Sequence, residues 1–284
     1  MIKLIKSVNI FDFIYFVSFN LSMTVISSGG FLPTNTLSAL LNTKTKEIIF
    51  SLVMLLSFFS LFFTYNLVFY KKKGIKFIQE DIYLIFYLLI ITFVCFVLID
   101  QSIDFSLIFL AIISSISNIG LSMEETPNFL SFIFLILIII GGSFYSTSSG
   151  LRFIKIYSLF KFSINEMISH AKPKNVFINK LPFSEKIINL ADFYKYFLTI
   201  IVFIISSSVL TSILSISGIN LENSFKLSVS TIMNTVNSSM TGLNDLNFEN
   251  MHYLTKYSLI IFMIIGRVEL LTMLIICKKF FFKN

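Results

Sequence analysis

The chain has 284 residues, of which 56% are hydrophobic and only 13% are charged. Soluble domains carry about 25% charged residues, so this composition excludes an ordinary soluble protein and indicates an integral membrane protein. In a membrane protein the positions of the basic residues relative to the spans matter more than the formal net charge of +7. The net charge therefore does not indicate a nucleic-acid partner. The sequence contains no nucleophile–base pair, phosphate-binding loop or metal-ligand pattern, so we do not expect an enzyme.

A transmembrane helix requires about 20 predominantly apolar residues. Five segments reach this length, at about 47–70, 82–100, 128–157, 190–216 and 254–277. Three shorter or more polar segments lie at about 9–27, 104–118 and 223–238. Such segments are typical of re-entrant or interfacial helices. The sequence therefore predicts an all-α membrane protein that combines full spans with half-helices.

Each of the three short segments ends in a Ser-x-x-Gly motif that is followed by Phe or Leu. The copies are Ser27, Ser28, Gly29 and Gly30; Ser117, Asn118, Ile119 and Gly120; and Ser239, Met240, Thr241 and Gly242. One copy alone is an ordinary helix-ending turn, and that alternative stays open. Three copies, each after a half-helix and before a full span, indicate an internal repeat of span, half-helix, motif and span.

Basic residues cluster after three of the predicted spans. They are Lys71, Lys72, Lys73 and Lys76; Arg152, Lys155, Lys161, Lys172, Lys174, Lys180 and Lys186; and Lys278, Lys279 and Lys283. Lys and Arg accumulate in cytoplasmic loops, so these segments are predicted to face the cytoplasm. The motifs then face outward, which requires each half-helix to enter the membrane and return.

The three motifs suit the passage of a cation. A re-entrant half-helix places its C-terminus near the membrane midplane, and the partial negative charge there favours a cation. Extended residues after it, kept narrow by glycine, can direct backbone carbonyls at a common axis, as potassium channels do. The motifs contain no acidic side chain. The sequence therefore predicts potassium-channel-like pore units in which filter carbonyls alone hold K⁺.

Small and hydroxyl side chains interrupt the longest apolar run. They are Gly141, Gly142, Ser143, Ser146, Thr147, Ser148, Ser149 and Gly150. Backbone that leaves a helix inside a bilayer must be satisfied by protein or by a water-filled cavity. We therefore interpret this segment as a broken helix that lines a path. The alternative is that the helix simply ends at Gly141 and a loop follows.

Arg267 lies within the last predicted span, where an arginine costs about 2.5–3.5 kcal/mol on insertion scales. Glu269 is only two residues away, so it points to another face of the helix and is not the obvious partner. One interpretation places Arg267 in the path as an electrostatic barrier that contacts the break at 143–150. The other makes it a structural ion pair with a neighbouring helix or subunit.

Four segments resemble signatures of the Trk/Ktr/HKT potassium-transporter family, and of its TrkH branch most of all. GGSFYSTSSGLRFIKIYSLFK resembles the broken helix, IIGRVELLTMLII the final span, LSMTVISSGGF the second filter and SSISNIGLS the third. The resemblance runs from about residue 14 to the C-terminus. It implies four filter repeats around one pore, with Gly30 and Gly120 as filter glycines, 143–150 as the gating loop and Arg267 beside it.

The resemblance also implies a division of the chain. Residues 1–79 would form a partial second repeat, 80–162 the third repeat with the broken helix, 163–189 a cytoplasmic linker and 190–284 the fourth repeat. The opening repeat is missing. Either a companion polypeptide completes the pore, or the chain is a fragment of a longer gene product, or it does not conduct.

The family further implies a homodimer among membrane lipid, a cytoplasmic nucleotide-binding regulatory subunit, and no cofactor beyond the transported ion. The fourth filter departs from the family pattern. Direct matching puts Met240 at the filter glycine, whereas the internal pattern puts Gly242 there, and we expect Gly242. Phe144 and Tyr145 stand where small residues are usual, and their bulk is expected to narrow or close the path.

The resulting hypothesis is K⁺ or Na⁺ transport across a bacterial inner membrane, through a multi-pass chain whose filters face outward. The alternative is a non-conducting membrane subunit, a decayed relative that assembles with a complete transporter.

Overall fold

The computed structural model describes residues 10–34, 37–69, 75–98, 104–122, 128–169, 190–235, 238–243 and 250–267, with a few isolated positions besides. Over these residues the regular structure is helical, as predicted. The helices are α1 (Ile10–Ser27), α2 (Lys44–Phe58), α3 (Leu61–Phe69), α4 (Ile75–Leu98), α5 (Phe105–Ile116), α6 (Asn128–Ile139), α7 (Phe153–Ser169), α8 (Leu190–Ile216), α9 (Leu221–Ile232), α10 (Ser238–Thr241) and α11 (Tyr253–Arg267).

Two described helices are long and apolar enough to cross a bilayer, over Gln79–Leu98 in α4 and Phe193–Ile216 in α8. The half-helices predicted at 9–27 and 104–118 correspond to α1 and α5. The third half-helix, α9, ends at Ile232, six residues before the predicted boundary at 238. The last predicted span is described as α11 only as far as Arg267, and most of the predicted linker at 163–189 lies outside the described residues.

The single span predicted over 47–70 is wrong, because the structure divides it into α2 and α3. The break follows from polar partners at Ser60 and at the end of α2. The N–H and hydroxyl of Ser60 both donate to the carboxylate of Asp81 on α4. The carbonyls of Ser57 and Phe58 at the end of α2 accept N–H groups from residues 148 and 143. The backbone groups freed at this break are therefore satisfied by protein.

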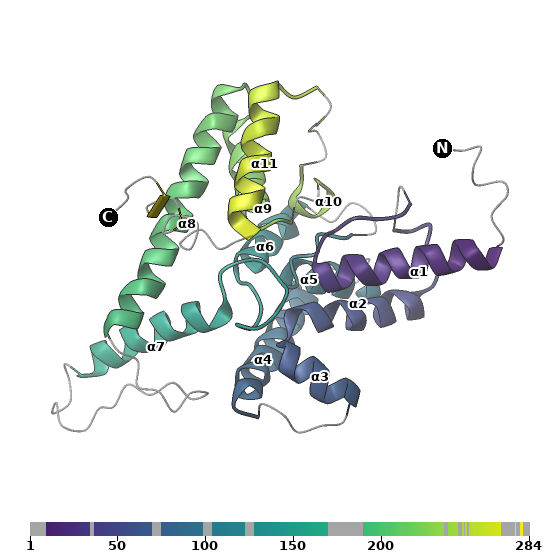
Figure 1. Ribbon diagram of the computed structural model, residues 1–284, viewed down its shortest axis with the longest axis horizontal. Coiled ribbons are helices and arrows are strands. Elements are labelled where there is room, and N and C mark those ends of the chain that lie inside the picture. Colours follow the sequence, from purple (N-terminus) through teal and green to yellow (C-terminus); the bar gives the residue numbers. More distant parts are fainter. Residues whose placement is uncertain are drawn as a thin grey trace.

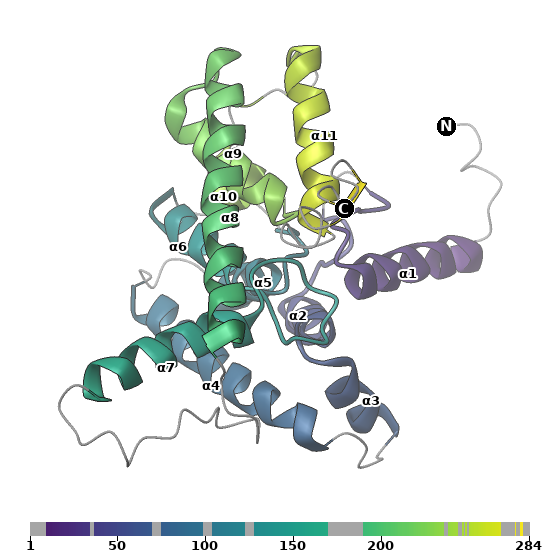
Figure 2. The same cartoon turned by 60° about the vertical axis from the view of Figure 1, so that its left-hand side comes forward.

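The helices pack in groups that follow the sequence (Figure 1). Helices α8, α9 and α11 contact one another, α1 packs on α2, and α5 contacts both α2 and α6. Figure 2 shows α7 crossing one end of α8, and α1 extending away from the centre of the molecule. Many large apolar side chains on α1, α4, α8 and α11 are exposed. An apolar surface of this extent suits contact with lipid.

Candidate functional site

Three half-helices, α1, α5 and α9, end in turns of the same backbone geometry. Ser28, Asn118 and Asn234 stand at matching positions, with φ of 48°, 55° and 56°. The next N–H in each turn bonds a carbonyl five residues back, which is the long bond of a Schellman helix end. These bonds are Gly29 N to Thr24 O at 3.0 Å, Ile119 N to Ser114 O at 3.1 Å and Thr235 N to Ser230 O at 2.8 Å.

The three turns lie next to one another. A Cβ atom built on Gly30 would stand 2.4 Å from the carbonyl oxygen of Ile119, and one built on Gly120 would stand 3.5 Å from the backbone of Thr235. The first turn therefore contacts the second, and the second contacts the third. Both glycines also have positive φ, of 72° and 76°, which side chains rarely adopt. Close contact between the first two turns thus depends on glycine at Gly30, whereas at Gly120 it is the positive φ that favours glycine.

The third turn differs in position from the motif that the sequence suggested. Counting from Asn234, the position equivalent to Gly30 and Gly120 is Val236, which itself lies outside the described residues. The predicted motif at Ser239 to Gly242 follows later, where Ser238–Thr241 form the single helical turn α10 beside α6. Gly242 itself has a positive φ, of 68°, as Gly30 and Gly120 do, so the register of this copy stays a prediction. A better signal would have been a Ser or Thr four residues before Ser or Asn, which recurs at 24–28, 114–118 and 230–234.

The segment after α6 forms a loop that closes on itself and resumes as α7. Its two ends are joined by Gly141 N to Leu151 O at 2.8 Å and by Leu151 N to Ile139 O at 3.0 Å. A Cβ on Gly142 would stand 2.3 Å from the carbonyl oxygen of Phe58, so the loop docks closely on the end of α2. Most of the loop residues are buried against other parts of the protein. We call residues 140–152 the gating loop, after the role predicted for them.

Arg152 organises the inside of the gating loop. Its Nη1 atom donates to the carbonyls of Ser143, Ser146 and Ser148 at 3.2, 3.0 and 3.1 Å, and to the hydroxyl of Ser146 at 3.0 Å. The charge pattern predicts Arg152 to be one of the cytoplasmic loop charges. In the structure it satisfies carbonyls that have left the helix.

Two carboxylates on α4, which no sequence motif predicts, bind this region from outside the loop. Glu80 Oε2 accepts from the Ser143 hydroxyl and from the Phe144 N–H, both at 3.2 Å. Asp81 accepts from the N–H and hydroxyl of Ser60 at 2.9 and 2.5 Å. Glu80 is 6% exposed and Asp81 is fully buried. The pair therefore fixes both the gating loop and the α2–α3 break to α4.

The bulky residues of the gating loop point away from its interior. Phe144 and Tyr145 are 44% and 39% exposed. Their rings pack edge-on at 5.0 Å, and Tyr145 packs against Phe62 of α3 at 5.3 Å. The expectation that their bulk narrows the path is not supported by this placement.

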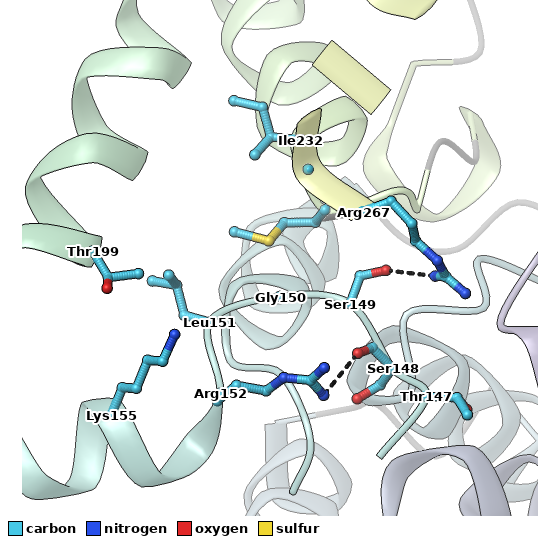
Figure 3. A pocket seen from close by; sticks show the side chains of 12 residues that line it. Thr147, Ser148, Ser149, Gly150, Leu151, Arg152, Lys155, Thr199, Ile232 and Arg267 are labelled. Carbon is cyan, nitrogen blue, oxygen red and sulfur yellow. Dashed lines mark hydrogen bonds between the residues drawn. The ribbon is translucent and has the colours of Figure 1, made fainter. Parts of the chain in front are cut away.

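Arg267 at the end of α11 joins the gating loop to the first turn. Its Nη1 donates to Ser149 Oγ at 3.0 Å, and its Nη2 donates to the carbonyl of Ser27 (Figure 3). A Cβ on Gly266 would stand 2.0 Å from the carbonyl oxygen of Ile232, so α11 meets the end of α9 backbone to backbone. Arg267 therefore contacts the break at 143–150, and its role as a barrier stays a prediction. Glu269 lies outside the described residues.

A cavity of about 190 Å³ adjoins these groups. It is lined by residues 147–152 of the gating loop, by Lys155 of α7 and Thr199 of α8, and by Ile232, Met233, Gly266 and Arg267. Figure 3 shows Arg152 and Arg267 on either side of the serine-rich segment and Lys155 beside Thr199. The filter, gate and barrier residues predicted from the sequence thus meet in one region, apart from the motif at Ser239–Gly242.

A comparison with solved structures relates this arrangement to a known fold. The chain is similar to the crystal structure of the potassium transporter TrkH from Vibrio parahaemolyticus, with a TM-score of 0.74 and 21% sequence identity. The match covers 89% of this chain and 56% of the TrkH chain, so this chain spans little more than half of that length. At this identity the similarity shows a TrkH-like fold and no more. A scan against protein-family models and a search of curated proteins gave no match.

Proposed function

We propose that the chain is part of a TrkH-type transporter that moves K⁺ or Na⁺ across the bacterial inner membrane. The observation that carries this proposal is the contact between equivalent helix-ending turns, at Gly30 against Ile119 and Gly120 against Thr235. Three half-helices then direct their C-terminal partial negative charges and their following carbonyls towards one region. Such a region is favourable for a cation that has shed its water. The TrkH-like fold supports the same proposal.

In this proposal the ion crosses the backbone carbonyls of the turns without covalent chemistry or a bound cofactor. The membrane potential supplies about 2.3 kcal/mol per charge per 100 mV. The filter side faces outward and the gating loop lies on the cytoplasmic side of the filter. Arg267, which bonds both the loop and the first turn, is then the electrostatic barrier between filter and cytoplasm.

The described turns contact one another in series, which leaves a fourth filter position to be filled. We propose that a further repeat fills it, either from a companion polypeptide or from another part of a longer gene product. We also propose a homodimer within membrane lipid, controlled by a cytoplasmic nucleotide-binding subunit. These assignments follow the family resemblance, and no nucleic acid is involved.

The second candidate is a non-conducting membrane subunit that assembles with a complete transporter. The observation that favours it is Val236, a branched side chain at the position that glycine occupies in the other two turns. A filter needs close backbone approach at each such position, which valine opposes. A chain with valine at this position could keep the fold and the helix packing while lacking a symmetric filter.

Potassium uptake in a transport-deficient bacterial strain separates the two candidates. The chain is expressed alone and then together with the DNA that lies immediately upstream of its start. Rescue of growth at low K⁺ only with the upstream segment supports a completed four-repeat pore. Rescue by the chain alone supports conduction but contradicts the need for a further repeat. No rescue in either case, with the chain inserted in the membrane, contradicts transport and favours the subunit.

A further inference from the structure

Ser114, four residues before the left-handed position of the second turn, holds the extended segment that follows this turn. Its carbonyl accepts the N–H groups of Ile119 and Gly120, at 3.1 and 3.5 Å. Its hydroxyl accepts the N–H of Leu121 at 2.6 Å. Ser114 is fully buried, and Leu121 is 3% exposed. Three consecutive N–H groups are therefore directed back onto one buried residue of α5.

The backbone conformation of the second turn explains how one residue collects three N–H groups. Successive N–H groups gather on one side of the chain where left-handed and right-handed residues alternate. Asn118 and Gly120 are left-handed, with φ of 55° and 76°, and Ile119 between them is not one of the described residues with a positive φ. A segment of this kind ordinarily binds an anion. Here the two oxygens of Ser114 take that place.

The carbonyls of the same peptide units point the opposite way. The peptide units of the described residues are trans, and in a planar trans unit the C=O is directed opposite to the N–H. Because the three N–H groups face α5, the carbonyls of Asn118, Ile119 and Gly120 face away from it. The position of the Ile119 oxygen agrees, since it would stand 2.4 Å from a Cβ built on Gly30 in the first turn. Ser114 thus aligns three consecutive oxygens on the side of α5 where the turns meet.

Thr24 has the equivalent position in the first turn and makes a related pair of bonds. Its carbonyl accepts the N–H of Gly29 at 3.0 Å, and its hydroxyl donates to the carbonyl of Phe31 at 2.5 Å. Thr24 is 6% exposed. Phe31 and Leu121 each come directly after the glycine of positive φ in their turn. In both turns, therefore, one buried hydroxyl in the last turn of the half-helix fixes the residue after that glycine.

We propose that Thr24 and Ser114 are positioning residues that determine the preference of the filter for K⁺ over Na⁺. The inference rests on the proposed function, because the aligned oxygens affect selectivity only if ions pass them. Selectivity in such filters depends on the number and positions of the carbonyl oxygens around the ion. The two hydroxyls act on these positions through the backbone, and not on the ion itself.

The effect on the backbone is tested on the purified full chain in detergent, by hydrogen exchange of peptides that span residues 117–122. In Ser114→Ala the N–H of Leu121 loses its acceptor, so we expect its exchange to be about tenfold faster, as for the loss of one buried hydrogen bond. Ser115→Ala is the matched control, because Ser115 is equally buried but its hydroxyl donates to the Ala111 carbonyl within α5. Equal exchange in the two variants would overturn the proposal.

The effect on selectivity is tested by competition between K⁺ and Na⁺ for uptake in the transport-deficient strain, with the upstream segment present if rescue requires it. The K⁺ over Na⁺ preference should fall several-fold in Ser114→Ala. It should keep the wild-type value in Ser115→Ala and in Ser114→Thr, which retains the hydroxyl. An unchanged preference in Ser114→Ala, with faster exchange of Leu121, would also overturn the proposal.

A pair of variants at Thr24 guards against misfolding of Ser114→Ala. Valine has the shape of threonine without the hydroxyl that bonds Phe31, so Thr24→Val should lower the preference, whereas Thr24→Ser should keep it. The same preference in these two variants would contradict the role of Thr24. A wild-type chain that takes up neither ion, with or without the upstream segment, contradicts the proposed function instead. The exchange experiment then still tests the alignment of the carbonyls by Ser114.

Discussion

The contact between the first two turns gives the sharpest test of the filter assignment. In Gly30→Ala the new Cβ would stand 2.4 Å from the carbonyl oxygen of Ile119, whereas real Cβ contacts are essentially never under 3.0 Å. One turn must therefore move by about 0.6 Å or more relative to the other. The backbone oxygen cannot rotate away as a flexible side chain would, and the carbonyl that moves belongs to the proposed filter.

The energetic cost has two parts. Holding alanine at φ of 72° costs about 1–2 kcal/mol, and overpacking against fixed backbone costs about 1–3 kcal/mol. We therefore expect Gly30→Ala to lower the free energy of unfolding by about 2–5 kcal/mol. Because carbonyl positions set ion binding, K⁺ over Na⁺ preference should fall as well.

Gly29→Ala is the matched control. Its Cβ would meet the Ser27 hydroxyl at 3.0 Å and the Phe31 ring at 3.4 Å, both parts of side chains that can move. Unlike Gly30, Gly29 is not one of the described residues that have a positive φ. Thermal unfolding in detergent and uptake competition between K⁺ and Na⁺ are measured for both variants. Equal behaviour of the two would refute the reasoning that Gly30 is fixed by contact between filter turns.

Four other substitutions test separate parts of the site. Arg267→Ala should raise leak current if the guanidinium is a barrier, measured as K⁺ flux in proteoliposomes; unchanged flux with lost expression would favour a structural role. Gly120→Asp should abolish or redirect selectivity, and a wild-type K⁺ preference in that variant would contradict the filter assignment. Val236→Gly should increase K⁺ over Na⁺ preference in a rescue strain, and an unchanged ratio would argue against equivalence of the third turn. Asp81→Asn should lower unfolding stability by about 1–3 kcal/mol, since the two hydrogen bonds from Ser60 go to different carboxylate oxygens and Asn replaces one of these acceptors by an NH₂ donor; a melting temperature equal to wild type would contradict this.

The helical elements follow from hydropathy because each depends on its own residues. The length and polarity of the apolar segments together separate the spans in α4 and α8 from the half-helices α1 and α5. The break between α2 and α3 could not be read in this way. It depends on Asp81, which lies 21 residues from Ser60 in the chain, and local sequence carries no record of that partner.

The sequence predicted that each half-helix ends in a tight turn, but it predicted the position of only the first two turns correctly. Ser-x-x-Gly located the first two turns, where glycine follows the left-handed residue by two positions. At the end of α9 Asn234 supplies the left-handed conformation, and Gly242, whose φ of 68° is also positive, follows eight residues later. The barrier interpretation did anticipate contact between Arg267 and the break, which the bond to Ser149 provides. The contacts of Glu80 and Arg152 with the gating loop could not be predicted, because they depend on burial and on distant partners and not on residue type.

The contacts of the gating loop divide into two sets with different consequences for opening. The hydrogen bonds from Arg152 Nη1 to Ser143, Ser146 and Ser148 lie within the loop, so they can persist while the loop moves as one body. Those that fix the loop to the rest of the protein run to the end of α2, to the start of α3, to Glu80 and to Arg267. Opening would break this second set and leave the first intact. If the proposed gating role holds, the first set keeps the loop rigid and the second decides how readily it moves, so that Glu80 and Arg267 would have the greater influence on opening.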